Sequence, residues 1–120
     1  MQFNENTPIY LQIVRAIKEK IALGELASGD KFPSVRDIAS EFRVNPNTVS
    51  RSTQILEQEG IIYSKRGIGS FIVEDDKMIG DMRNQMAKDH CQSFIKNMDR
   101  LGFSRQEALE ILTEVYDGKH

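Results

Sequence analysis

The sequence is poor in the residues that form disulfides and metal sites. It contains one cysteine, Cys91, and two histidines, His90 and His120, among 120 residues. One cysteine cannot form an intrachain disulfide, and so few ligands at this spacing exclude a zinc site. We expect Cys91 to be a small buried hydrophobic residue, with a redox role as the alternative.

Long apolar runs are also missing. No stretch approaches the roughly 18 apolar residues that a membrane-spanning helix requires. The N-terminal segment MQFNENTPIY has neither the basic start nor the apolar centre of a signal peptide. The sequence therefore predicts a cytoplasmic protein without a membrane partner.

The sequence does not assemble a catalytic site. It offers no nucleophile with a nearby base and no pair of catalytic carboxylates. Glu57 and Glu59, for example, are two positions apart on a predicted helix and point in different directions. We therefore expect neither enzymatic activity nor a cofactor.

Charge of one sign is not in large excess. The formal net charge is -2, and the surplus of acidic residues follows Glu74. This balance argues against indiscriminate binding to nucleic acid. Specific binding stays open, because a neutral or acidic protein can carry a local basic face.

The most informative stretch predicts a helix from Asn45 to Glu59. Asn45 is a favourable N-cap, and Pro46 suits the first helical position because no intrahelical N–H bond is lost there. One face is inward and built from Val49, Thr53, Ile55 and Leu56. The opposite face has no carboxylate before Glu57 and carries Asn47, Thr48, Ser50, Arg51 and Gln54. This face suits DNA, although an ordinary solvated helix has a similar pattern.

A shorter helix precedes this stretch, from Val35 to about Phe42. Ser34 is its predicted N-cap, with Asp37 three residues later in the pattern of a capping box. Arg36 projects outward from the first turn. Because a turn of three or four residues joins the two helices, the pair matches a helix-turn-helix.

A hairpin is predicted after the second helix. Two β-rich runs, residues 61–64 and 70–73, flank the sequence KRGIG. The tip runs from Lys65 to Gly69 and carries Arg66 and Gly67. Glycines suit a tight turn by themselves, but two adjacent cations at a narrow tip also suit contact with the DNA backbone or the minor groove. This hairpin is the predicted wing, and Lys31 and Phe32 can form a very short strand.

The last part of the chain predicts two helices. The first has an apolar stripe formed by Ile79, Met82, Met86, His90, Phe94, Met98 and Leu101. Ser104 and Glu107 predict a capping box at the start of the second. Two such helices cannot enclose a core, so they pack on the winged domain, on a second copy of themselves, or on both. We predict a mainly α fold with a small β-hairpin wing: a winged helix-turn-helix domain at residues 1–75 and a helical dimerisation region at residues 76–120.

Several segments together resemble a known family. The first 75 or so residues contain, in order, PIYLQI, FPSVRDIA, VNPNTVSR, LEQEGII and RGIGSFIV. This array resembles the winged-helix domain of the GntR family of bacterial transcription regulators, and VNPNTVSR with the short C-terminal region is similar to the YtrA-type subgroup. The resemblance implies a homodimeric repressor that binds a palindromic operator, often in front of genes for an ABC transporter. It leaves room for a small-molecule effector of unknown identity. The alternative is a winged-helix module that binds proteins and not DNA.

The resemblance also implies a set of DNA contacts. Carried onto this sequence, the family's contacts fall on Ser34, Arg36, Asn47, Thr48, Ser50, Arg66 and Gly67. Position and charge add Arg51 and Lys65 as phosphate contacts. Many relatives have arginine where Pro46 and Ser50 stand here, so base recognition would depend on Arg36, Asn47 and the hydroxyl groups. For Arg36, the alternative is a surface ion pair with Asp37 or Glu41.

Overall fold

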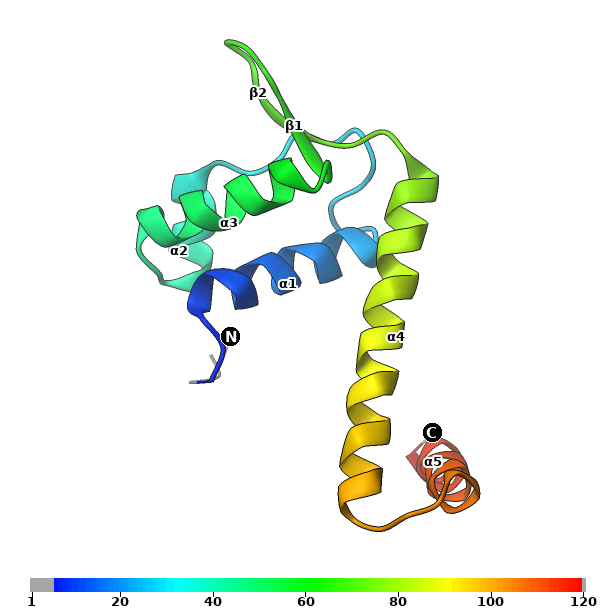
Figure 1. Ribbon diagram of the computed structural model, residues 1–120. Helices are drawn as coiled ribbons and strands as arrows, with labels where there is room; N and C mark the ends of the chain where they lie inside the picture. Colours follow the sequence, from blue (N-terminus) through cyan, green and yellow to red (C-terminus); the bar gives the residue numbers. More distant parts are fainter. Residues whose placement is uncertain (1–5, 120) are drawn as a thin grey trace. The chain divides into compact units, whose positions relative to one another are not determined.

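The computed structural model describes residues 6–119, which form five helices and one β-hairpin (Figure 1). In chain order the elements are α1 (Ile9–Ala22), α2 (Val35–Phe42), α3 (Pro46–Gln58), β1 (Ile62–Lys65), β2 (Gly69–Ile72), α4 (Asp76–Arg100) and α5 (Arg105–Lys119). The mainly α fold with a small hairpin is confirmed. None of the helices in residues 6–119 combines the length and apolar character that crossing a membrane requires.

The chain divides into two compact units inside α4. The first unit ends at Arg83, and the second begins at Asn84. The predicted boundary at residue 75, between a DNA-binding and a dimerisation region, stays a prediction.

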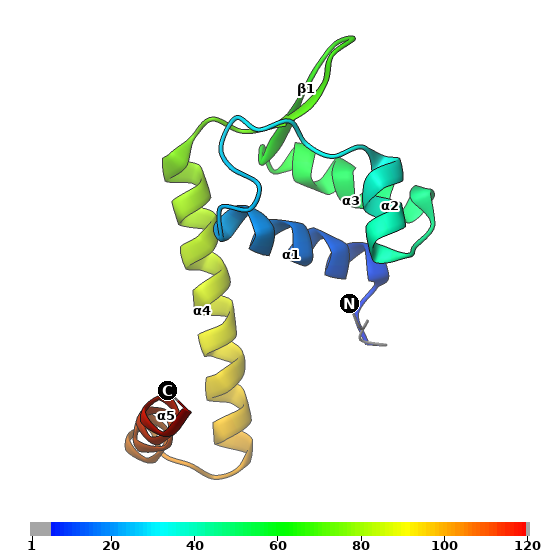
Figure 2. The ribbon, with the colours of Figure 1, turned by 180° about the vertical axis from the view of Figure 1, so that it is seen from behind.

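The core of the first unit lies between its helices and the base of the hairpin. α1 and α3 lie alongside each other and α2 packs on α3, as both views show (Figures 1 and 2). The buried apolar side chains are Ile13, Val14, Ile17, Ile21, Phe32, Ile38, Ala39, Val49, Leu56, Ile61, Ile62 and Ile72. Since α3 turns Val49 and Leu56 into this core, its opposite face is left to solvent.

Side-chain caps fix where α2 and α3 begin. The Oγ of Ser34 accepts the backbone N–H of Asp37 at 3.1 Å. The Oδ1 of Asn45 accepts the backbone N–H of Asn47 at 2.8 Å. Both caps are as predicted, and each satisfies a backbone N–H that has no partner inside its helix.

The turn between these helices uses an unusual backbone conformation. Arg43, which caps the end of α2, has a φ of 57°, in the left-handed region. This left-handed conformation turns the chain sharply at the end of α2, so that α3 can begin at Pro46. α3 ends at Gln58, one residue before the predicted end at Glu59.

The hairpin is the predicted wing. β1 and β2 pair antiparallel, and Lys31 adds an isolated bridge to Phe71 beside them. Gly67 and Gly69 have φ values of 77° and 134°. L-residues rarely adopt these values, so the narrow tip depends on glycine.

The second unit buries little of its apolar surface. Among its described residues, Met98 and Ala108 are the buried hydrophobic ones. The large apolar side chains that stay exposed are Ile95 (55%), Leu101 (70%), Leu109 (44%), Val115 (54%) and Tyr116 (62%). A pair of helices has no further layer of structure that could cover these apolar side chains. The sequence pattern likewise indicates that two such helices cannot enclose a core.

Cys91 is exposed, which contradicts the prediction that it is buried. It borders an apolar hollow between α4 and α5 that Phe94, Met98 and Leu112 also line. A third layer of structure packed on α4 and α5 would cover the Cys91 side chain. Among the described residues of the second unit, nothing covers Cys91 on this side of the hollow.

A reciprocal capping box starts α5, as predicted. The backbone N–H of Ser104 donates to the Glu107 carboxylate at 2.9 Å, and the N–H of Glu107 donates to the Ser104 Oγ at 3.2 Å. Two contacts with Ser104 lower the pKa of Glu107 below its ordinary value. The bond from the backbone N–H is the larger cause, and the contact with the hydroxyl is the smaller one.

Acidification is therefore expected to weaken the start of α5. Because the pKa of Glu107 is lower in the folded protein than in the unfolded chain, its stabilisation is complete above about pH 5 and is lost as the pH falls through the folded-state pKa. Thermal unfolding followed by circular dichroism between about pH 7 and pH 3 measures this loss. Glu107→Gln does not titrate, so its melting temperature should fall less over the same range. Equal decreases in both proteins would contradict the assignment.

Candidate nucleic-acid interface

The outer face of α3 is polar and free of carboxylates over its first turns. Its exposed or half-buried members are Asn47, Thr48, Ser50, Arg51 and Gln54. The first acidic residue is Glu57, in the last turns of the helix. Asn47 presents an amide that can both donate and accept, as recognition of an adenine edge in the major groove requires. This face can therefore approach an anionic double helix without repulsion.

The first turn of α2 adds a hydroxyl and a guanidinium. Ser34 uses one lone pair for capping, so its hydroxyl hydrogen is still available to a phosphate oxygen. Arg36 is exposed, and the ion pair with Glu41 that the sequence allows is not formed. Glu41 instead accepts Lys20 at 2.5 Å.

The cations predicted to contact DNA carry no bound carboxylate. Within residues 6–119 the ion pairs are Lys18–Glu59, Lys20–Glu41 and Lys77–Asp81. None of them involves Arg36, Arg51, Lys65 or Arg66. No carboxylate among the described residues neutralises their charges, so they are available to phosphates.

The wing holds its cations beside an aromatic pair. The rings of Tyr63 and Phe71 are stacked with centroids 5.9 Å apart. The Nζ of Lys65 lies 4.7 Å from the centroid of Phe71 and 5.8 Å from that of Tyr63. Arg66 and Gly67 follow at the exposed tip. The ring faces favour a fixed ammonium position at the base of the tip.

The fold brings Lys31 to the wing and Tyr10 to α3. The sequence does not single out either residue as a DNA contact. Lys31 pairs with Phe71, and its Cε lies 3.1 Å from where a Cβ on Gly69 would stand. Tyr10, on α1, lies under the guanidinium of Arg51, with 3.8 Å between Cζ and the ring centroid. The short strand that the sequence predicts at Lys31 is the local signal that could have identified Lys31 as a neighbour of the wing. For Tyr10 the sequence contains no local signal.

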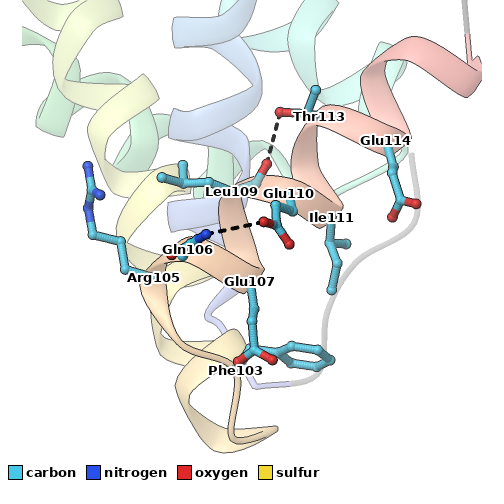
Figure 3. A pocket seen from close by; sticks show the side chains of 9 residues that line it. All are labelled: Phe103, Arg105, Gln106, Glu107, Leu109, Glu110, Ile111, Thr113 and Glu114. Carbon is cyan, nitrogen blue, oxygen red and sulfur yellow. Dashed lines mark hydrogen bonds between the residues drawn. The ribbon is translucent and has the colours of Figure 1, made fainter.

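One further concave surface does not suit DNA. An open hollow on α5 is lined by nine residues, three of them glutamates, and Figure 3 shows Glu107, Glu110 and Glu114 around it. Arg105 is the one cation in this lining. A surface with this charge repels phosphate. In the part of the chain that the structure describes, no group of His, Cys, Asp or Glu could hold a metal ion.

All nine predicted contact residues lie in the first unit, on α2 with its cap, α3 and the wing. Known transcription regulators match this chain over most of its length. The family described as "Bacterial regulatory proteins, gntR family" matches residues 9–72. Two proteins of Bacillus subtilis are each 37% identical: the HTH-type transcriptional regulator YhcF over 98% of this chain and 97% of its own length, and the HTH-type transcriptional repressor YtrA over 92% and 85%. A solved GntR family transcriptional regulator from Listeria monocytogenes has a TM-score of 0.87 at 37% identity, over 94% of this chain and 99% of that one.

Proposed function

We propose a specific function from one premise: the chain belongs to the gntR family of bacterial regulatory proteins, and so is a DNA-binding transcription regulator and not an enzyme. The proposal is a homodimeric repressor that binds a palindromic operator in the cytoplasm. The observation that carries it is the carboxylate-free outer face of α3, flanked by cations that have no carboxylate partner among the described residues.

The proposed contacts divide into two kinds. Base recognition is assigned to Arg36 and Asn47, because a guanidinium and an amide match the edges of guanine and adenine. The other proposed contacts bind phosphates or the sugar backbone, or line the narrow tip: Ser34, Thr48, Ser50, Arg51, Lys65, Arg66 and Gly67. Phosphate contacts supply affinity and orientation, and the two base contacts supply selectivity.

Dimerisation is assigned to the second unit. Its exposed apolar residues need a cover, and a symmetric second copy supplies one that is equally apolar. A two-fold dimer would place two recognition helices about 34 Å apart, one turn of DNA. A palindromic operator presents two identical half-sites at such a spacing.

Repression follows from occupancy of the operator, and the relative YtrA is itself named a repressor. We propose genes for a transporter as the target, as the resemblance implies.

An effector would act by changing the separation of the two recognition helices across the dimer. Distance measurements between the two wings, with and without the effector, test this. A constant separation at changed DNA affinity would contradict it.

The deciding experiment is a titration of the purified protein against the DNA upstream of its own gene, at two salt concentrations. An unrelated duplex of equal length is the control. Tight, saturable and salt-sensitive binding of a dimer to the upstream DNA alone supports the proposal. Equal affinity for both duplexes contradicts sequence-specific binding at this site. A folded dimer that binds neither would favour the protein-interaction module.

Replacing Lys65 with alanine is expected to weaken binding to all sequences alike. In the proposed complex its ammonium neutralises one phosphate in each half-site, so the dependence of log affinity on log salt should become shallower by about one unit for each bound protomer. Titrations of operator and unrelated DNA at several salt concentrations measure this slope. Lys77→Ala is the matched control, because Lys77 is already paired with Asp81 at 2.9 Å. A changed preference among operators would show that Lys65 contacts a base.

A further inference from the structure

Tyr10 and Arg51 form the closest contact between a cation and a ring in the described chain. The Cζ of Arg51 lies 3.8 Å from the centroid of Tyr10. The corresponding distances for Lys65 over Phe71 and Lys20 over Phe42 are 4.7 Å and 5.9 Å. A planar guanidinium at 3.8 Å is in stacking contact with the ring.

The ring is itself held in place by the fold. Tyr10 is half-buried in the first turn of α1. Its carbonyl oxygen accepts the Oγ of Ser52 at 2.7 Å, and Ser52 is fully buried. Ser52 is the residue that follows Arg51 on α3. Two adjacent positions of α3 therefore contact Tyr10: Ser52 binds its backbone and Arg51 lies over its ring.

Stacking leaves the hydrogen-bonding groups of Arg51 unused. The Cζ of Arg51 lies over the Tyr10 ring, and none of the five guanidinium N–H groups donates to another of the described residues. Arg51 is exposed and has no carboxylate partner among the described residues. It lies one turn after Asn47, on the same side of α3. The N–H groups are thus available on the edge of the face that meets DNA.

We propose that Tyr10 is a positioning residue for DNA binding: its ring holds the Arg51 guanidinium in one orientation, so that the free N–H edge meets a phosphate of the DNA backbone. This inference rests on the proposed function. A free arginine side chain loses conformational freedom when it binds a phosphate. Stacking on Tyr10 removes much of that freedom before DNA arrives. Tyr10 makes no contact with DNA in this arrangement.

A mutant cycle on operator affinity tests the proposal. Tyr10→Leu removes the ring face and should weaken operator binding about 2- to 10-fold. The salt slope should not change, since Arg51 still neutralises its phosphate. Arg51→Ala should weaken binding and also lower the slope by about one unit for each bound protomer. In the Arg51→Ala background, Tyr10→Leu should have no further effect on affinity. Tyr10→Phe keeps the ring and should bind as the wild type does.

Controls separate positioning from a purely structural role. The melting temperature of each variant reports how much Tyr10 contributes to packing α1 on α3. Arg15→Ala removes another exposed arginine, outside the proposed interface, and should bind as the wild type. If Tyr10→Leu does not fold, Arg51→Lys replaces it, because lysine keeps the charge and lacks the planar face. Weaker binding at an unchanged slope is then the expected result.

Two outcomes overturn the proposal. If Tyr10→Leu weakens binding equally with and without Arg51, Tyr10 acts independently of the guanidinium. If Tyr10→Leu folds and binds normally, the ring does not position Arg51. In both cases the wild type still distinguishes the operator from unrelated DNA, so the proposed function stands. If the wild type does not distinguish them, the proposed function and this inference fail together.

Discussion

Replacing Ile95 with aspartate is expected to convert the proposed dimer into a monomer and to weaken operator binding by about 100- to 10,000-fold. Ile95 is 55% exposed in the single chain, so an aspartate there stays hydrated in a monomer. In the proposed dimer the same carboxylate would face apolar side chains of a second copy. An unpaired charge at an apolar interface costs several kcal/mol, which favours dissociation.

The loss of DNA affinity follows from the loss of linkage between the two halves. In a dimer, binding of one half-site brings the second recognition helix close to its own half-site. A monomer retains all its DNA contacts and lacks this effective concentration. Its binding should therefore fit a single half-site and depend less steeply on salt, because fewer phosphates are neutralised in each event.

Light scattering on a sizing column and titration of the operator measure the two effects together. Asn97→Asp is the matched control, since Asn97 is exposed and lies about 200° around α4 from Ile95. This variant adds the same charge on the other side of the helix and should remain dimeric. If Ile95→Asp also stays dimeric and binds normally, the dimer interface lies elsewhere. If it becomes monomeric and keeps full affinity, dimerisation does not contribute to operator binding.

Local signals were sufficient to predict the segments that carry the site. Ser34 and Asn45 bind backbone groups two or three residues away, and Gly67 allows a conformation of its own backbone. Such effects act within a few positions, so one sequence reveals them. The start of each helix in the helix-turn-helix and the tip of the wing were predictable for this reason.

Contacts between distant segments were not predictable in this way. Ser52 lies three positions after Val49, on the inward side of α3, and no local pattern predicts that its hydroxyl bonds to Tyr10, 42 positions away. The stacking of Arg51 depends on the same packing of α1 on α3. Cys91 is exposed because nothing within its own unit covers it. Periodicity shows that a face is apolar, and the tertiary structure decides what covers it.

The choice between the two interpretations of Arg36 also depended on a distant residue. The sequence offers Glu41 as an ion-pair partner on the same helix. In the structure, Lys20 of α1 binds that carboxylate at 2.5 Å. Arg36 is left exposed at the first turn of α2 without an acidic partner among residues 6–119. The surface ion pair is therefore not formed among the described residues, and the DNA contact of Arg36 stays a prediction.

Replacing Arg36 with alanine is expected to cost about 1–3 kcal/mol of operator binding and to remove the preference at one base pair. A guanidinium can bind the O6 and N7 atoms of guanine together, and a methyl group binds neither. Titrations against the operator and a set of duplexes with single base-pair changes measure both effects. Arg15→Ala, on the exposed side of α1, is the control and should retain affinity and preference. Unchanged binding after Arg36→Ala would exclude Arg36 from base recognition. Uniform weakening across all the duplexes would identify it as a phosphate contact, and Asn47 would then be the principal base contact of this interface.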